Sequence, residues 1–221
     1  MNNKQIEMLK SIGFDLKKRQ IKKRDWYNIS VQSGISEEFM REFQDFLYWE
    51  EISCSQKLSE NFIREFKNKL DWRYISGHQT LSSEFILEFK EELEWDEISY
   101  HQTLSEDFIR ENHLLLDWEY ISSQQKLSED LIREFKDEVE WEKISTHHIL
   151  SDGFLEEFKK EICWEFYLYY QEASFPIIKK FVAKTKFNEL ANFKTSHLND
   201  VQKEEIERIL ELKNLFATGS S

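Results

Sequence analysis

Seven tryptophans follow one another at a constant spacing of 23 residues, without insertion or deletion: Trp26, Trp49, Trp72, Trp95, Trp118, Trp141 and Trp164. A fixed period of this length is typical of repeat proteins, in which one supersecondary unit stacks on copies of itself. Each copy buries a face that it would otherwise expose to water. The spacing therefore predicts one repeat array rather than several globular domains.

The composition indicates which kind of unit repeats. The 221 residues include only 5 Gly and 1 Pro, while 40% are hydrophobic. Scarce Gly and Pro argue against the tight turns of β-sandwiches and barrels, and favour helices joined by short connections. We expect an all-α fold, an α-solenoid of six 23-residue helix pairs over 26–163. A basic helical cap over 1–25 and a degenerate repeat with capping helices over 164–218 complete the predicted organisation.

The copy that begins at Trp118 shows the pattern of one repeat. Trp118, Ile121 and Gln125 have the spacing of one helix face, and Asp117 stands at the N-cap position. Ser128 then provides a cap for a second helix. Because a large apolar residue recurs at one place, we expect the tryptophans in the core. The Ser four residues after each of the first six tryptophans is expected to bond the carbonyl of that Trp.

A glutamate also recurs once per copy, usually after an arginine, at Glu42, Glu65, Glu88, Glu111, Glu134 and Glu157. One interpretation is a ladder of surface ion pairs between neighbouring copies, each of which stabilises the fold by roughly 0–1 kcal/mol. The other is a regular row of carboxylates that binds a basic partner.

The charge of the chain is unevenly distributed, with a net charge of −13. Residues 1–24 hold eight Lys or Arg against two acids, whereas residues 25–164 hold 14 against 33. The basic run has three interpretations: a solvated face docked on the acidic array, a contact for nucleic acid or another anionic surface, or a nuclear import signal. The candidate anion contacts are Lys17, Lys18, Arg19, Lys22, Lys23 and Arg24, and we expect no nucleic acid elsewhere.

Cysteine usage and hydropathy indicate the compartment. Cys54 and Cys163 occupy non-equivalent positions, so no disulfide framework is expected and a reducing environment is favoured. No segment approaches the roughly 20 apolar residues of a membrane span, and residues 1–10 lack the hydrophobic core of a signal peptide. We expect an intracellular protein without membrane contact, in the cytoplasm or, if the basic run is an import signal, in the nucleus.

The sequence carries no recognisable catalytic motif. It lacks a Gly-rich phosphate loop, the His-Glu-x-x-His and Gly-x-Ser-x-Gly patterns, and a cysteine paired with a fixed histidine. His78 and His101 are equivalent in adjacent copies, but no third ligand accompanies them, so no metal site is expected. We therefore predict neither enzyme activity nor a cofactor.

The positions that vary between copies are candidates for partner binding. Tyrosine and histidine recur on the first helices, away from the Trp and Ile seam, and they form one aromatic strip if these helices lie side by side: Tyr74, His78, Tyr100, His101 and Tyr120. Repeat proteins bind partners through such variable surfaces. The alternative interpretation is idle variation of an exposed surface.

The fourth copy departs from the pattern, because Asn112 stands where Phe is expected and Leu114 and Leu115 follow. Either the second helix of this copy shifts its register, or two leucines are exposed and become a contact site.

The segments 127–137 (LSEDLIREFKD) and 72–76 (WRYIS) resemble the short tandem repeats of uncharacterised proteins from large DNA viruses of amoebae, phages and some bacteria. The resemblance covers 26–163 and implies a helical repeat fold and a host-facing binder or inhibitor, without any activity or functional residue. Two functions are expected: a non-catalytic scaffold for a protein partner, such as a host factor, or an acidic nucleic-acid mimic in the basic groove of a nuclease or defence protein.

Overall fold

The computed structural model of the chain is all-α. It describes residues 2–14, 20–182, 185 and 192–218, and this part of the chain contains sixteen helices and no strand. The helices recur as pairs with the 23-residue period, so the predicted α-solenoid is confirmed. The chain divides into two compact units, Met1–Leu115 and Leu116–Ser221.

Each repeat contributes two short helices. The first helices are α2 (Lys23–Val31), α4 (Trp49–Ser55), α6 (Trp72–His78), α8 (Trp95–His101), α10 (Trp118–Gln124), α12 (Trp141–His147) and α14 (Trp164–Tyr170). The second helices are α3 (Glu37–Glu42), α5 (Glu60–Phe66), α7 (Ser83–Glu88), α9 (Glu106–Asn112), α11 (Glu129–Glu134), α13 (Asp152–Glu157) and α15 (Phe175–Phe181). Two further helices lie at the ends, α1 (Asn3–Ser11) and α16 (Asp200–Thr218).

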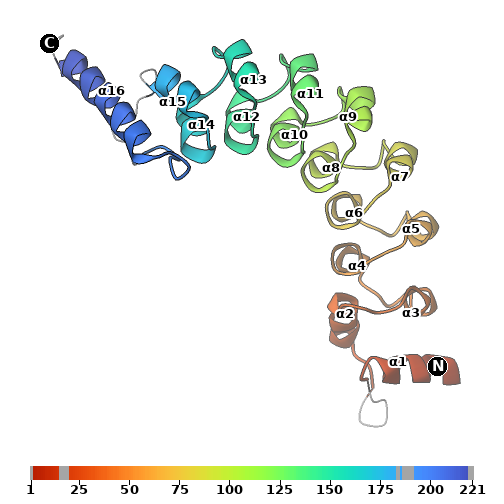
Figure 1. Ribbon diagram of the computed structural model, residues 1–221. Coiled ribbons are helices and arrows are strands. Elements are labelled where there is room, and N and C mark those ends of the chain that lie inside the picture. The colour runs from red at the N-terminus through yellow and green to blue at the C-terminus, as the bar shows by residue number, and fades with distance from the viewer. Residues whose placement is uncertain (1, 15–19, 183–184, 186–191, 219–221) are drawn as a thin grey trace. The chain divides into compact units, whose positions relative to one another are not determined.

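Within each unit the two kinds of helix form separate rows (Figure 1). In the first unit α2, α4, α6 and α8 lie in one row and α3, α5, α7 and α9 in the other; the second unit arranges α10, α12 and α14 opposite α11, α13 and α15. First helices contact their neighbours in the row, as α4 with α6 and α12 with α14, and α15 contacts α16. Each unit is therefore built by stacking of neighbouring repeats.

Helices of six or seven residues are too short to be stable alone in water, and capping side chains fix where they begin. Ser59 Oγ accepts the backbone N–H of Phe62 at 3.2 Å. The equivalent serine caps the second helix of each pair, from α3 to α15. Asp117 caps α10 as predicted. The second helices are equally short, and α11 for example has its C-cap at Phe135.

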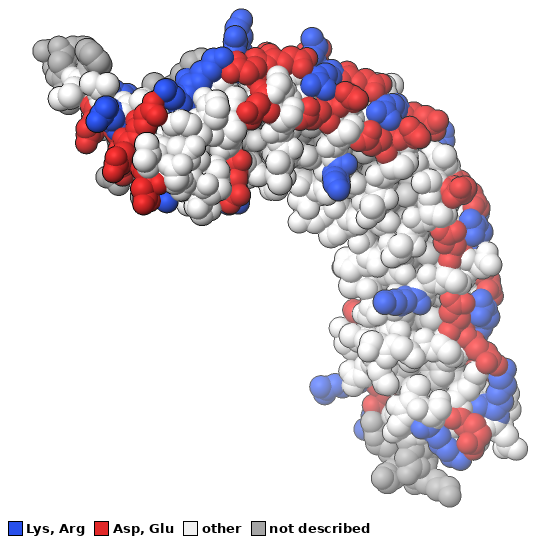
Figure 2. All heavy atoms as spheres, viewed as in Figure 1, with Lys and Arg blue, Asp and Glu red and all other residues white. Residues whose placement is uncertain are grey.

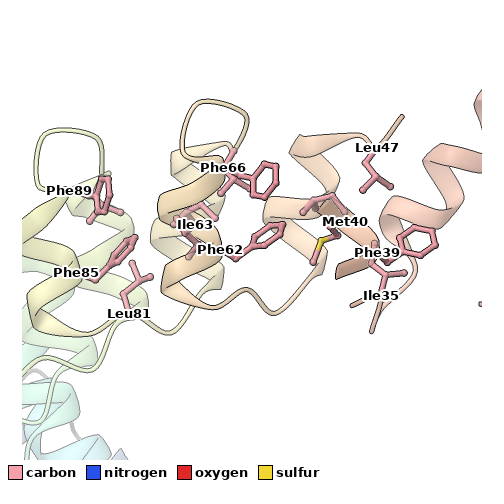
Figure 3. Packing of buried hydrophobic residues seen from close by; sticks show 14 of the residues in the cluster. Ile35, Phe39, Met40, Leu47, Phe62, Ile63, Phe66, Leu81, Phe85 and Phe89 are labelled. Carbon is pink, nitrogen blue, oxygen red and sulfur yellow. The ribbon is translucent and has the colours of Figure 1, made fainter. Parts of the chain in front are cut away.

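The core lies between the two rows of helices. Ile75 of α6 and Phe85 and Ile86 of α7 are completely or almost completely buried. Figure 3 shows Phe62 and Phe66 of α5 extending toward the side on which Met40 lies. The guanidinium of the preceding repeat's Arg41 lies 5.0 Å from the centroid of the Phe62 ring, which places this ring between consecutive repeats.

The tryptophans are less buried than the repeat pattern predicted. Trp26 and Trp164 are buried, but the five between them are half-buried. Trp49 stacks on Phe66 with ring centroids 4.8 Å apart, while its Nε1 donates to the carbonyl oxygen of Gln44 at 2.9 Å. The indole needs a place for its polar edge, so it lies at the margin of the core. The centre is formed by the isoleucine three residues later, for example Ile52.

The serine that stands four residues after a tryptophan bonds the carbonyl oxygen of that tryptophan as predicted, at Ser30, Ser53, Ser76, Ser99 and Ser145, and it also links repeats. Ser53 Oγ donates to the carbonyl oxygen of Trp49 at 2.7 Å and accepts the backbone N–H of Asp71 at 2.9 Å. Asp71 precedes the first helix of the next copy. One small hydroxyl thus satisfies two backbone groups and couples neighbouring first helices.

The two ends differ in how well they match the expectation. The helix α1 ends before Gly13, which has φ +84°, and Asn199 caps α16 by accepting the N–H of Gln202 at 2.9 Å. The basic segment predicted to be helical over 1–25 is not helical over 20–22, since α2 begins at Lys23. Leu9 is fully buried in the core of the first unit, so α1 is an integral part of that unit.

Candidate protein-binding surface

Four of the five predicted aromatic positions lie together on α6 and α8. The ring centroids of Tyr74 and His78 are 5.6 Å apart, those of His78 and His101 6.2 Å, and those of Tyr100 and His101 4.5 Å. Tyr100 and the two histidines are exposed, and Tyr74 is half-buried. The side chains form a continuous chain of rings in the order Tyr74, His78, His101 and Tyr100, which we call the aromatic strip.

A carboxylate lies beside the aromatic strip because a glycine leaves space for it. A Cβ atom added to Gly77 would lie 2.9 Å from Oε2 of Glu97. In that space Glu97 accepts a hydrogen bond from Arg73 Nε at 3.1 Å, and its other oxygen lies 3.4 Å from Nε2 of His101. The hydrogen bond to Glu97 raises the pKa of the Arg73 guanidinium. The bond from Arg73 connects α6 with α8, and the carboxylate lies beside the His101 ring.

Tyr120 is the fifth residue predicted for the strip. It belongs to the second unit, on α10, where it is half-buried. Its membership of the strip remains a prediction.

The leucines of the fourth copy are exposed, and the register is unchanged. Leu114 is 85% and Leu115 44% exposed, whereas Leu116 is buried like the residue at the same place in other copies. Asn112 remains at the end of α9 and donates from Nδ2 to the carbonyl oxygen of Phe108 at 2.9 Å. Of the two alternatives, exposure is therefore correct. Whether the pair contacts a partner remains a prediction.

The basic run is only partly described. Lys17, Lys18 and Arg19 lie outside the described residues. Lys22, Lys23 and Arg24 are exposed at the start of α2 and, within the part of the chain that the structure covers, form no ion pair. Their role as anion contacts remains a prediction.

Three of the recurrent glutamates, Glu65, Glu88 and Glu157, form ion pairs between neighbouring repeats, as one of the two interpretations predicted. Arg41 lies 2.8 Å from Glu65, Arg64 lies 2.8 Å from Glu88, and Arg133 lies 2.9 Å from Glu157. Each pair joins neighbouring second helices. Figure 2 shows acidic and basic side chains interleaved along the second-helix row of each unit, while the first-helix side of the same view is largely uncharged.

A second ladder, made of buried side-chain amides, was not predicted from the sequence, although a glutamine stands seven residues after most tryptophans. Gln79 is buried; its Nε2 donates to the carbonyl oxygens of Ser53 at 3.1 Å and Gln56 at 2.8 Å, and its Oε1 accepts the N–H of Leu58 at 2.9 Å. Gln56 and Gln102 make the equivalent bonds. A polar residue that recurs on a buried helix face must find hydrogen-bond partners. The recurrence of glutamine on the face of Trp and Ile is therefore the sequence signal of the ladder.

No group of three or more His, Cys, Asp or Glu among the described residues is arranged to hold a metal ion. None of the described helices combines the length and apolar character needed to cross a membrane.

Comparison of the chain with protein-family models, with curated proteins and with solved structures finds no match.

Proposed function

We propose that this chain is a non-catalytic repeat scaffold that binds a protein partner through the face of its first helices, with the aromatic strip of α6 and α8 at the centre. The observation that carries the proposal is the continuous chain of Tyr74, His78, His101 and Tyr100 across two repeats. Aromatic side chains offer a large contact area at a low cost in conformational entropy, and they are enriched among the residues that dominate binding.

The rigidity of the underlying helices supports this proposal. The carbonyl oxygen of Ser76 in α6 accepts a buried hydrogen bond from Gln102, the C-cap of α8, and its hydroxyl accepts the N–H of Glu94, the N-cap of α8. Glu97 also binds Arg73 across the two helices. Side chains that are already ordered lose less entropy when a partner binds. The strip is therefore a pre-organised surface.

The ion-pair ladder argues against the acidic mimic. Glu65, Glu88 and Glu157 each lie against an arginine of the preceding repeat, whereas a mimic of nucleic acid needs a row of carboxylates that faces a basic partner. Exposed pairs of this kind contribute modestly to stability. The arginines also neutralise part of the negative charge that these glutamates would present to a basic partner.

The resemblance of the repeats to proteins of viruses and phages supports a narrower proposal, in which the partner is a host factor that the chain inhibits inside the cell. Free cysteines at 54 and 163 are consistent with a reducing compartment.

The test begins with capture of partners by the full chain from a lysate, followed by binding measurements on one purified partner. The double change Tyr74→Ala, Tyr100→Ala should weaken binding by at least about 30-fold, as expected for two anchor residues. Adding Tyr120→Ala tests whether the strip continues onto α10. The melting temperature should stay nearly constant, because Tyr100 is exposed and Tyr74 is half-buried.

The matched control changes charge on the second helices, by Glu65→Gln, Glu88→Gln and Glu134→Gln. Binding should survive this change if the strip is the contact. Loss of binding only in the glutamate variant, together with a steep fall of affinity as salt rises, would support the acidic mimic and overturn the proposal.

A further inference from the structure

His148 interrupts the glutamine ladder in the second unit. It stands seven residues after Trp141, where Gln56, Gln79 and Gln102 stand in earlier copies. It is only 8% exposed, and its Nε2 lies 2.8 Å from the carbonyl oxygen of Ser122. Because a carbonyl oxygen only accepts hydrogen bonds, Nε2 carries the proton and the lone pair of the neutral ring is on Nδ1.

The shorter ring makes fewer hydrogen bonds than a glutamine. In earlier copies the glutamine oxygen accepts the N–H of a leucine in the preceding repeat, Leu58 for Gln79 and Leu81 for Gln102. The corresponding leucine is Leu127, whose N–H forms no hydrogen bond with any residue that the structure describes. Nδ1 of His148 is likewise unbonded within the described chain.

Leu127 and His148 both line a hollow of about 410 Å³. Its lining includes His147, Lys126, Leu127 and His148 from two consecutive repeats. Every fully enclosed side-chain nitrogen or oxygen of the described chain has a partner, so the unbonded Nδ1 is not fully enclosed, and the hollow is the opening that His148 lines.

The side chains that line the hollow carry no negative charge. Lys126 is exposed and forms no ion pair with a described residue, and His147 uses Nδ1 to bond the carbonyl oxygen of Lys143 at 3.1 Å. Lys143 of α12 is paired with Glu119 of α10 at 3.3 Å, and from α14 Tyr167 directs its hydroxyl to the backbone of Leu150. No carboxylate lines the hollow.

We infer that this hollow is a pH-gated site for a small oxyanion, which is held by Nδ1 of protonated His148, the backbone N–H of Leu127 and the ammonium group of Lys126. At neutral pH the lone pair of Nδ1 repels an anion. When His148 takes up a proton, Nδ1 becomes a second donor beside the Leu127 N–H, and hydrogen bonds to an ionised acceptor are the strong ones. The site therefore binds its anion in mildly acidic solution and releases it at neutral pH.

The direct test is an NMR titration of the six histidines in the full chain, in sodium chloride, sulfate and acetate at equal ionic strength. His148→Gln assigns the His148 signal, and this variant keeps the fold because glutamine is the usual residue at the position. Sulfate or acetate should raise the titration midpoint of His148 by at least about half a unit, which corresponds to roughly threefold tighter binding to the protonated form. Sulfate and acetate separate a tetrahedral oxyanion from a carboxylate.

The matched controls are Lys126→Gln and, at the equivalent position of the second copy, Lys57→Gln. The first should reduce the rise of the midpoint, and the second should leave it unchanged. A second measurement compares melting temperatures: sulfate should stabilise the chain over chloride more at about pH 5 than at about pH 8, and His148→Gln should remove this difference. The inference is wrong if the midpoint of His148 is the same in all three salts, or if Lys57→Gln reduces the rise as much as Lys126→Gln.

Discussion

The side-chain amide of Gln102 donates to the carbonyl oxygen of Gln79 at 2.7 Å. Gln79 in turn donates to Gln56 at 2.8 Å, so a line of buried amides runs through three consecutive repeats of the first unit. Hydrophobic packing alone would tolerate sliding of one repeat against the next. The amides instead fix the offset between helices, because only one relative position satisfies all the buried backbone groups.

The first prediction concerns this ladder. Gln79→Leu keeps the volume but leaves two carbonyl oxygens and the N–H of Leu58 without their partner. We expect the free energy of unfolding to fall by at least about 3 kcal/mol, measured by urea denaturation, since each buried unsatisfied group costs on the order of 1–3 kcal/mol. The control Gln32→Leu alters an exposed side chain and should change stability by less than about 0.5 kcal/mol. Equal effects of the two variants would contradict the role of the ladder.

The second prediction concerns the N-terminal helix. Leu9 is fully buried in the core of the first unit, and Gln5 of α1 donates to Glu42 of α3 at 2.8 Å. Leu9→Ala should therefore cost about 2–5 kcal/mol, and deletion of residues 1–24 should destabilise the first unit. The charge of this region is better tested by Lys22→Gln, Lys23→Gln, Arg24→Gln, which should leave the unfolding curve within about 0.5 kcal/mol. A tolerated Leu9→Ala would show that α1 is dispensable.

The third prediction concerns the exposed leucines of the fourth copy. The preceding copy has Glu91 and Glu92 where Leu114 and Leu115 stand. The double change Leu114→Glu, Leu115→Glu should shift the free energy of unfolding by less than about 0.5 kcal/mol, because little apolar surface of Leu114 is buried. Chemical denaturation followed by circular dichroism measures this effect. A loss above about 2 kcal/mol would mean that the pair packs within the chain.

Much of the fold followed from the sequence because each repeat encodes its own boundaries. Ser128 and Asp117 cap their helices as expected, and Ile121 is fully buried at the predicted seam. The tryptophans were placed too deep because their recurrence indicates packing but says nothing about the indole N–H. That N–H must be satisfied, and Trp95 meets this need by donating to the carbonyl oxygen of Lys90 at 3.0 Å.

The sequence predicted which residues of α6 and α8 lie together in the aromatic strip, but not the contacts that they make. Position within the repeat assigned Tyr74, His78, Tyr100 and His101 to one face. The contact of Glu97 with Arg73 and His101 depends on the space that Gly77 leaves. The repeat pattern does not indicate which side chain fills that space. The hollow beside His148 was not predicted either. It depends on the hydrogen bond to the preceding repeat that a glutamine makes at this position and His148 does not.

The last prediction concerns the pH dependence of stability. Burial lowers the pKa of His148 from its ordinary value of 6.5. As the pH falls below about 6.5, the unfolded chain takes up a proton at this residue before the folded chain does, so the free energy of unfolding decreases until the folded pKa is passed. In chloride, His148→Gln should remove this loss. The free energy of unfolding of the variant, relative to that of the natural chain, should therefore rise as the pH falls from about 8 to about 5. The other histidines contribute equally to both proteins, so the difference between the two urea denaturation curves isolates His148. A difference that does not change with pH would show that His148 is solvated in the folded chain and that its ring is not part of the buried ladder.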